Sequence, residues 1–173
     1  MFKKSLLAVA LAFASSGAFA AAETYVMDNH HTQVEFSWNH FGFSNPVANF
    51  DNIEGSINYD ADDITKSSVE VTIATSSINS HVKDFNEHLA SADFFDVATY
   101  PEMTFQTARL EPAGDDRFRL IGSLTLHGVT REVAVDVEST GQTQDPWGNV
   151  RAGFAARTTI ERKEFGLTWN QVL

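Results

Sequence analysis

Residues 118–137 read FRLIGSLTLHGVTREVAVDV, and this stretch decides the fold. Apolar side chains occupy alternate positions on both sides of His127-Gly128, from Phe118 to Leu126 and again from residue 133 to residue 137. A period of two is typical of a strand that buries one face, and a two-residue break with glycine is typical of a hairpin turn. The stretch therefore predicts two antiparallel strands joined by a tight turn.

The same alternation recurs on both sides of this hairpin. Alternating runs occupy residues 33–40, 53–59, 68–73, 103–110 and 150–162, and a short first strand is expected near residues 25–28. Together with the hairpin they make about eight strands, most of them joined by short turns. Such a pattern predicts an all-β domain, either an antiparallel barrel or a sandwich.

One segment departs from the period of two. Its apolar residues are spaced by 4, 3 and 4 positions, which is the spacing of one helix face. These residues are Ile78, Val82, Phe85 and Leu89. Ser76 and Ser77 are expected to cap the start of this helix, and Ser91 to begin a second short turn that carries Phe94 and Phe95. The sequence thus predicts one helical insertion between strands.

The first twenty residues have the pattern of a cleavable secretory signal. Lys3 and Lys4 precede a short apolar run, and Ala18-Phe19-Ala20 has the small residues that signal peptidase requires. The apolar run is too short to span a bilayer, and no later segment qualifies. Residues 1–20 are therefore predicted to be a signal peptide and residues 21–173 one domain that is exported to the periplasm.

The composition excludes several classes of function. The net charge is −11, and the predicted signal contains two lysines and no acid, so the exported part is more negative still. Such a chain repels phosphate backbones, and nucleic-acid binding is not expected. The chain has no cysteine, which excludes disulfides, thiol catalysis and thiolate metal sites.

The six histidines are the candidates for metal binding. His81, Asp84 and His88 have a spacing that would place them on one helix face, where a metal site is conceivable. A solvated polar face opposite the apolar one explains the same spacing, and we prefer that interpretation. His40 ends an apolar strand and is expected near the mouth of a pocket.

No set of residues points to catalysis. The sequence has no strand-turn-helix nucleophile motif and no glycine-rich phosphate loop. We therefore expect a protein that is not an enzyme. Phenylalanine is abundant, with 14 residues, and this abundance fits either a packed core or a cavity for an apolar ligand.

Four motifs together resemble the YceI-like family of bacterial polyisoprenoid-binding proteins. They are SADFFDV at residues 91–97 with Tyr100-Pro101, GSLTLHGVT at 122–130, DPWG at 145–148 and RKEFGL at 162–167. The motifs span nearly the whole predicted domain in the order of the family.

The resemblance implies an extended lipocalin-like antiparallel barrel with a helix-bearing loop. It also implies a long apolar tunnel that holds an isoprenoid chain, such as a polyprenyl phosphate or a quinone tail, as ligand, with no resident cofactor. The expected tunnel residues from the strands are Phe36, Trp38, Ile57, Val71, Ile73, Phe105, Leu120, Leu124 and Phe154. Phe85, Leu89, Phe94 and Phe95 are expected to line the helical end, with His40 at the tunnel mouth.

The leading prediction is therefore a periplasmic carrier of an isoprenoid lipid. Two alternatives stay open: a metal- or haem-binding protein that uses the helix histidines, and an enzyme that acts on an isoprenoid or quinone substrate. Formation of a homodimer is also left open.

The sequence departs from the family pattern at its end. In the family a further strand follows the RKEFGL segment and closes the barrel, whereas this sequence ends six residues after Leu167. The absent strand would pair with the strand near Val34 and with the last predicted strand. An open barrel leaves two rows of backbone groups unpaired. We therefore expect either a longer natural chain or a partner that supplies the strand.

Overall fold

The computed structural model describes residues 22–60 and 62–170, and strands dominate both segments. The predicted signal peptide lies outside the described residues. The larger sheet is antiparallel and has the strand order β1-β4-β5-β7-β8-β9-β10. Its strands are β1 (Glu23–Val26), β4 (Ile53–Tyr59), β5 (Ser68–Ala74), β7 (Glu102–Pro112), β8 (Arg117–Leu126), β9 (Val129–Gln144) and β10 (Val150–Arg157). The smaller sheet contains β2 (Val34–Ser37), β3 (Val47–Phe50) and β6 (Ile78–Asn79), in that order.

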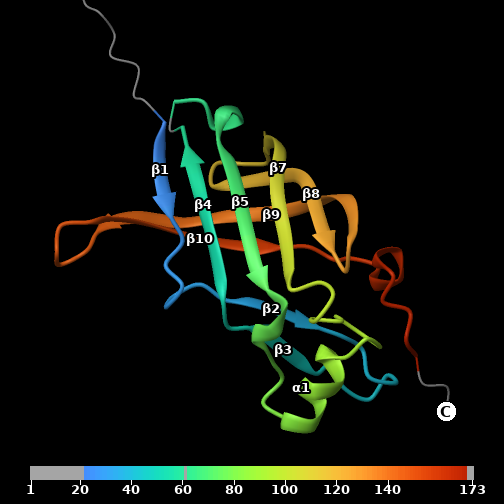
Figure 1. Ribbon diagram of the computed structural model, residues 1–173. Helices are drawn as coiled ribbons and strands as arrows, with labels where there is room; N and C mark the ends of the chain where they lie inside the picture. Colours follow the sequence, from blue (N-terminus) through green and yellow to red (C-terminus); the bar gives the residue numbers. More distant parts are fainter. Residues whose placement is uncertain (1–21, 61, 171–173) are drawn as a thin grey trace, which may run out of the picture.

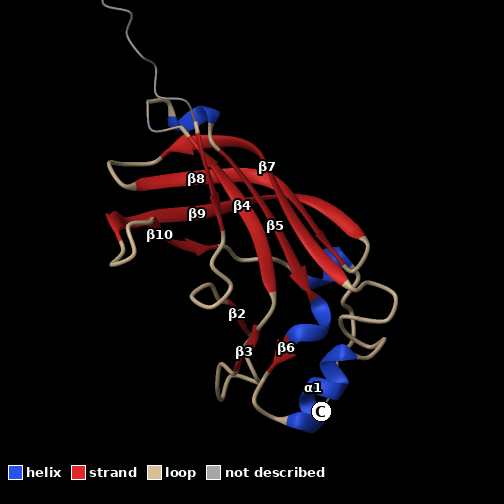
Figure 2. Cartoon of the chain, turned by 60° about the vertical axis from the view of Figure 1, so that its left-hand side comes forward, coloured by secondary structure: helices blue, strands red, loops and turns tan. Residues whose placement is uncertain are grey.

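The larger sheet curls into a half-barrel. Figure 1 shows β4 and β5 running steeply across the direction of β9 and β10, which belong to the same sheet. Figure 2 shows the smaller sheet together with the helix α1 (Lys83–Ala90) at one end of the curl. The predicted all-β, lipocalin-like class with one helical insertion is thus confirmed, although the strands of the described residues are divided between two sheets.

The central hairpin forms as its sequence predicts. β8 and β9 pair from Arg117 to Leu126, and the ladder ends where Leu126 faces Val129. His127 and Gly128 have φ values of 51° and 72°, so both central turn residues have a left-handed backbone. This combination is typical of a type I′ turn, whose twist matches that of the flanking strands.

The core lies where the smaller sheet and α1 pack against the end of the curl. It contains buried residues from nearly every element at this end. They are Phe50, Ile78, Leu89, Phe95, Met103, Leu126, Phe165 and Leu167. These side chains close one end of the half-barrel, and Ile53, Leu110 and Leu120 are buried elsewhere on the sheet.

The helix prediction is wrong at its start. α1 begins at Lys83, after Val82, whose side chain is 56% exposed, while Ile78 lies in strand β6. Ser76 and Ser77 belong to the 3₁₀ turn Thr75–Ser77 and do not cap α1. Only Phe85 and Leu89 of the predicted face are helical, because Ile78 pairs with Phe50 in the sheet before the chain turns. The second short turn does begin at Ser91, whose carbonyl accepts a hydrogen bond from Phe94 N.

The last strand ends at Arg157, five residues earlier than predicted. After it the chain forms the 3₁₀ turn Arg162–Phe165, which ends at Gly166 with a φ of 81°. This turn directs Phe165 and Leu167 into the core, and burial of these two side chains explains why the extended backbone stops.

Within the described residues, β10 pairs only with β9 and β2 pairs only with β3. These are the two strands beside which the absent strand is expected, and that expectation stays a prediction. Among the helices that the structure describes, none has the length and apolarity needed to cross a bilayer.

Candidate functional site

The concave face of the half-barrel carries the predicted tunnel residues in rows. Val71 lies directly opposite Phe105, which in turn lies opposite Leu124 on the next strand. Residues directly opposite in a ladder share one face of the sheet, so the three side chains form a continuous apolar strip. Neighbouring rows on the same face hold the other sheet residues of the prediction, Ile57, Ile73 and Leu120.

Two glycines make room on this face. A Cβ atom at Gly122 would lie 2.6 Å from Cζ of Phe105, so the Phe105 ring lies directly over that glycine. A Cβ atom at Gly55 would lie 2.8 Å from Sδ of Met27, which shows that Met27 covers the opposite part of the face. Larger side chains at these positions would displace Phe105 and Met27 and change the shape of the face.

Much of this face is only partly covered. Ile57, Val71, Phe105 and Leu124 are half-buried. Polar side chains border them at the ends of their rows, where Tyr25 lies opposite Ile57 and Arg131 lies opposite Leu124. Phe154 of β10 lies opposite Ser139 and is 38% exposed. We call the face that carries Ile57, Val71, Phe105, Leu120, Leu124 and Phe154 the trough; Leu120 is buried there, and the other five are partly exposed. A partly exposed apolar surface is typical of a place where a ligand or partner is bound.

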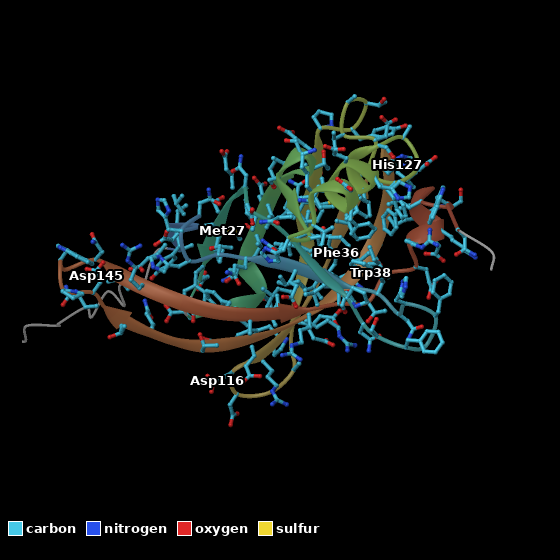
Figure 3. All side chains as sticks on the ribbon, turned by 90° about the horizontal axis from the view of Figure 1, so that it is seen from below. Met27, Phe36, Trp38, Asp116, His127 and Asp145 are labelled. Carbon is cyan, nitrogen blue, oxygen red and sulfur yellow. The ribbon has the colours of Figure 1, made fainter. Side chains whose placement is uncertain are left out.

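An aromatic cluster closes one end of the trough. Phe36 stacks on Phe50 with ring centroids 5.6 Å apart and meets the edge of Phe95 at 5.8 Å. Trp38 lies 5.7 Å from Phe36 and 5.5 Å from Phe85 of α1. Figure 3 shows Phe36 of β2 close to Trp38, which follows that strand. The structure thus brings four predicted tunnel residues together, and Phe50 is a member that the prediction missed.

A second group of rings includes a residue that the prediction also missed. Phe94 packs 5.1 Å from Trp169, and the ring of His88 meets the edges of both. Trp169 follows the last predicted strand, where no periodicity signals a contact. Leu89 and Phe95 lie in the core beside this group.

The histidines do not converge on one metal site. His81 precedes α1 with a φ of 62°, so it does not share a helix face with Asp84 and His88 as the spacing implied. His88 Nε2 instead lies 3.5 Å from an oxygen of Asp93. In the part of the chain that the structure describes, no three His, Asp or Glu side chains gather closely enough to hold a metal ion.

Two other histidines occupy turns. His40 is exposed and bridges to Ser44 at the end of the chain segment that follows Trp38, next to the aromatic cluster. His127, at the tip of the central hairpin, folds its ring against Tyr100 at a centroid distance of 4.4 Å. Its Nε2 is buried without a hydrogen-bond partner among the described residues.

The opposite end of the half-barrel is held by polar contacts. Gln142 Nε2 donates to the Tyr25 hydroxyl at 2.8 Å, which joins β9 to β1. Arg151 of β10 lies 3.0 Å from Asp145 and 3.4 Å from Asp28. The two outer strands of the curled sheet therefore approach each other through side chains, and Figure 1 shows β1 meeting the β9–β10 hairpin there.

Asp145 is the centre of these contacts. Its carboxylate accepts hydrogen bonds from the backbone N–H groups of Trp147 and Asn149 and from the Arg151 guanidinium. Burial by itself raises the pKa of this carboxyl, but the hydrogen bonds from Asn149 and Arg151 outweigh burial and lower the pKa to about 2. The carboxylate is therefore ionised at neutral pH and keeps the hairpin tip in one conformation.

Two open concavities are lined in part by β9. One of about 480 Å³ lies between the β8–β9 strands and the end of β10, and one of about 320 Å³ lies beside the Arg162–Phe165 turn. Charged residues such as Arg117, Asp136 and Glu161 border them, and no predicted tunnel residue does. An apolar chain is better matched by the trough than by either concavity.

Comparison with known proteins places this geometry in a family. The family model of the YceI-like domain matches residues 25–173. A UPF0312 protein of Vibrio cholerae is 40% identical over 168 residues, which cover 95% of this chain and 89% of the relative. The crystal structure of a YceI protein of Campylobacter jejuni has a TM-score of 0.67 at 30% identity, and the match covers 82% of this chain and 83% of that chain. Burkholderia cenocepacia BcnA shares the fold, with a TM-score of 0.71 at 22% identity over 85% of this chain and 83% of its own.

Proposed function

This chain belongs to the YceI-like family, and from that premise we propose that it binds the hydrocarbon chain of an isoprenoid lipid in the trough and carries it through the periplasm without transforming it. The observation that supports this proposal most strongly is the apolar row Val71, Phe105 and Leu124, which is continuous across three strands and only half-buried. Leu124 packs against the core, whereas Val71 and Phe105 are left partly open, and a partly open apolar surface is typical of a binding site.

The energetics of the trough suit a long, slender ligand. Removing a hydrocarbon from water contributes roughly 0.8 kcal/mol for each CH₂ group, so a few prenyl units supply a large gross driving force. Val, Ile, Leu and Phe contribute contact without hydrogen-bonding groups, which favours apolar chains of different lengths over one specific compound. The aromatic cluster would limit how far such a chain can advance.

Binding without catalysis is the simpler account of the trough. The row Val71, Phe105 and Leu124 has no ionisable or nucleophilic side chain, and the Thr107 hydroxyl on the same face is hydrogen-bonded to the Val69 backbone. General acid–base or covalent catalysis requires such groups within hydrogen-bond reach of the reacting atoms. The contacts of Arg151 with Asp28 and Asp145 lie at the polar end, where they join strands to one another.

A charge placed inside the trough tests the proposal. Phe105→Glu would place a carboxylate on the concave face, where desolvation by a hydrocarbon is costly. The matched control is Thr104→Glu, one residue earlier on the outward face of the same strand. We expect uptake of a fluorescent polyprenol to fall by roughly tenfold or more in Phe105→Glu, a factor that corresponds to about 1.4 kcal/mol, and to be unchanged in Thr104→Glu.

Circular dichroism of both variants reports whether the sheet is retained, and Phe105→Leu provides an apolar substitute if Phe105→Glu does not fold. Equal uptake by both glutamate variants would exclude the trough as the binding site. Absence of polyprenol uptake by the unaltered protein would reject the function itself.

A further inference from the structure

The segment after Trp38 exposes aromatic side chains beside the closed end of the trough. We define the rim loop as residues 39–45. Within it Phe43 is 88% exposed and Phe41 is 49% exposed. Isolated exposed apolar residues are ordinary, but two phenylalanines within three positions of one turn form a local apolar projection.

The rim loop is a defined turn and not an irregular connection. His40 N donates to Ser44 O at 2.8 Å, and Phe43 N donates to His40 O at 3.0 Å. Gly42 N donates to the Asn39 side chain at 2.8 Å. Phe41 and Gly42 have φ values of 52° and 78°, the left-handed pair of a type I′ turn. The turn therefore fixes the backbone from which the two phenylalanine side chains project.

A bulky residue at a positive φ is unfavourable, because its Cβ approaches the backbone oxygen. Glycine or asparagine would fit the Phe41 position with less strain. Strain of this kind that burial does not offset is found mainly at functional sites. The Phe41 ring contacts the His40 ring at a centroid distance of 4.6 Å, but its side chain remains half in water, so burial does not offset the strain.

Charge is absent from this part of the chain. Residues 36–50 contain no Asp, Glu, Lys or Arg, although such residues make up 20% of the whole sequence. The exposed side chain of Val47 lies in the same uncharged segment. The net charge of the whole chain is −11, so its other surfaces repel anionic lipids. An uncharged apolar projection on an acidic protein matches a neutral, zwitterionic lipid surface and not an anionic one.

The helix start adds to this surface. β3 and β6 pair at Asn49 and Asn79, so the chain before Asn49 and the chain after Asn79 leave the sheet at the same end. Val47 and Val82, which are 46% and 56% exposed, lie on these two outgoing segments. Lys83, the cation next to Val82, is paired with Glu87. The apolar projection thus extends from the rim loop toward the start of α1.

The rim loop also borders the proposed binding site. Trp38 immediately precedes it and packs against Phe36 and Phe85 of the aromatic cluster. Figure 3 shows Phe36 and Trp38 far from Asp145, which lies at the opposite tip of the molecule. A lipid surface that contacts the rim loop would therefore lie next to the closed end of the trough and away from the polar end.

From these observations we propose that the rim loop, with Val47 and Val82, is a docking surface for neutral phospholipid bilayers, which holds the protein beside the membrane while ligand exchanges with the trough. Docking itself follows from the surface alone, whereas the exchange of ligand there rests on the proposed function. The phenylalanine side chains would insert at the level of the lipid headgroups, and the rim loop itself contains no Asp, Glu, Lys or Arg that would have to be desolvated.

Flotation with phosphatidylcholine vesicles tests docking. The test variant is Phe41→Asn with Phe43→Ser, and the matched control is Trp147→Ser, which removes an 82% exposed aromatic ring at the Asp145 end. The unaltered protein and the control should float with the vesicles, at low salt and at high salt alike. The double variant should show a partition coefficient lower by roughly tenfold or more, and vesicles of phosphatidylglycerol should bind the unaltered protein less well.

Transfer of a polyprenol to the protein separates the two proposals. In the double variant, uptake from vesicles should slow while uptake of polyprenol added from ethanol stays unchanged. If the unaltered protein floats but takes up no polyprenol from either source, docking stands and the proposed function fails. Docking is overturned if the double variant floats like the unaltered protein, or if its main effect is to dissociate a dimer in sedimentation, which would make a second copy of the chain the occupant of this surface.

Discussion

Phe41 is the bulkiest of the non-glycine residues with a left-handed backbone in the described part of the chain. Its φ of 52° lies in a region that costs an L-residue roughly 1–2 kcal/mol, and its side chain remains half exposed. Neither property stabilises the folded state. We therefore infer that Phe41 serves the docking surface. We expect the folded state to become more stable when Phe41 is replaced.

We predict that Phe41→Asn raises the free energy of unfolding by about 1 kcal/mol, because asparagine tolerates the left-handed backbone that strains phenylalanine. Urea denaturation followed by circular dichroism measures the change. Phe43→Asn is the control, since Phe43 is highly exposed and is not left-handed, and its stability should stay within about 0.5 kcal/mol. A Phe41→Asn protein less stable than the Phe43→Asn protein would show that Phe41 has a structural role.

The positions of single side chains could be predicted where strand periodicity applies. Val71, Phe105 and Leu124 follow the period of two, and the register places them in one row. Phe50 and Trp169 were missed for a physical reason: their contacts come from segments far apart in sequence, and no local pattern encodes such contacts. The ligand contacts of the tunnel residues stay a prediction.

At the scale of elements, α1 shows how a local pattern can mislead. Ile78 and Val82 have helical spacing relative to Phe85, yet Ile78 is in a strand and Val82 is outside the helix. The turn between them includes His81 with a left-handed backbone, a conformation that spacing alone does not reveal. Pairing of Ile78 with Phe50 overrides the local helical preference.

Alanine substitutions on the predicted helix face test whether Val82 lies outside the helix. We expect Leu89→Ala to lower the free energy of unfolding by roughly 2–5 kcal/mol, because Leu89 is 4% exposed and its removal leaves a cavity. Val82→Ala should change it by no more than about 0.5 kcal/mol, because the Val82 side chain is largely in water. Urea denaturation of the two variants gives both free energies of unfolding. Comparable losses in the two variants would support the longer helix that the sequence predicts.

The β9–β10 hairpin provides a prediction about acidity. The pKa of Asp145 is lowered to about 2 in the folded chain from an ordinary value of 3.8, so the ionised carboxylate stabilises the hairpin tip. A lowered pKa means that this stabilisation is complete above about pH 4 and is lost as the pH falls through 2. The amides of Trp147 and Asn149, which donate to Asp145, report its protonation.

We expect the amide NMR signals of Trp147 and Asn149 to shift with a midpoint near pH 2 and to be constant between pH 5 and pH 7. Asp145→Asn should abolish this titration while it leaves the acid response of the rest of the sheet in place. A titration midpoint near the ordinary aspartate pKa of 3.8 would mean that the contacts of Asp145 with Arg151 and Asn149 do not form when the protein is in solution.

At the scale of the whole molecule, the sequence predicts the strands better than their assembly. Alternation identifies β4, β5, β7, β8 and β9, and the His127-Gly128 turn joins the last two as expected. The division into a curled sheet and a small sheet depends on which strands pair across long sequence distances, as Tyr25 and Gln142 illustrate from opposite ends of the chain. No local period encodes such pairing.

The whole molecule has two functional ends on this account. The Asp28–Arg151–Asp145 contacts hold the outer strands together at one end. The aromatic cluster and the rim loop lie at the other, with the trough between them. This polarity would allow a lipid to pass between a bilayer and the trough while the acidic remainder of the surface stays in water.

Photocrosslinking tests the central claim, that the trough holds an isoprenoid chain, most directly. A farnesol that carries a diazirine in its hydrocarbon chain is irradiated with the protein, and the labelled residues are identified by peptide mass spectrometry. The account predicts adducts on the concave face, at Val71, Phe105 and Leu124, that excess unlabelled polyprenol removes. Adducts distributed equally over the outward neighbours Thr72, Thr104 and Ser123, or adducts that polyprenol does not displace, would contradict it.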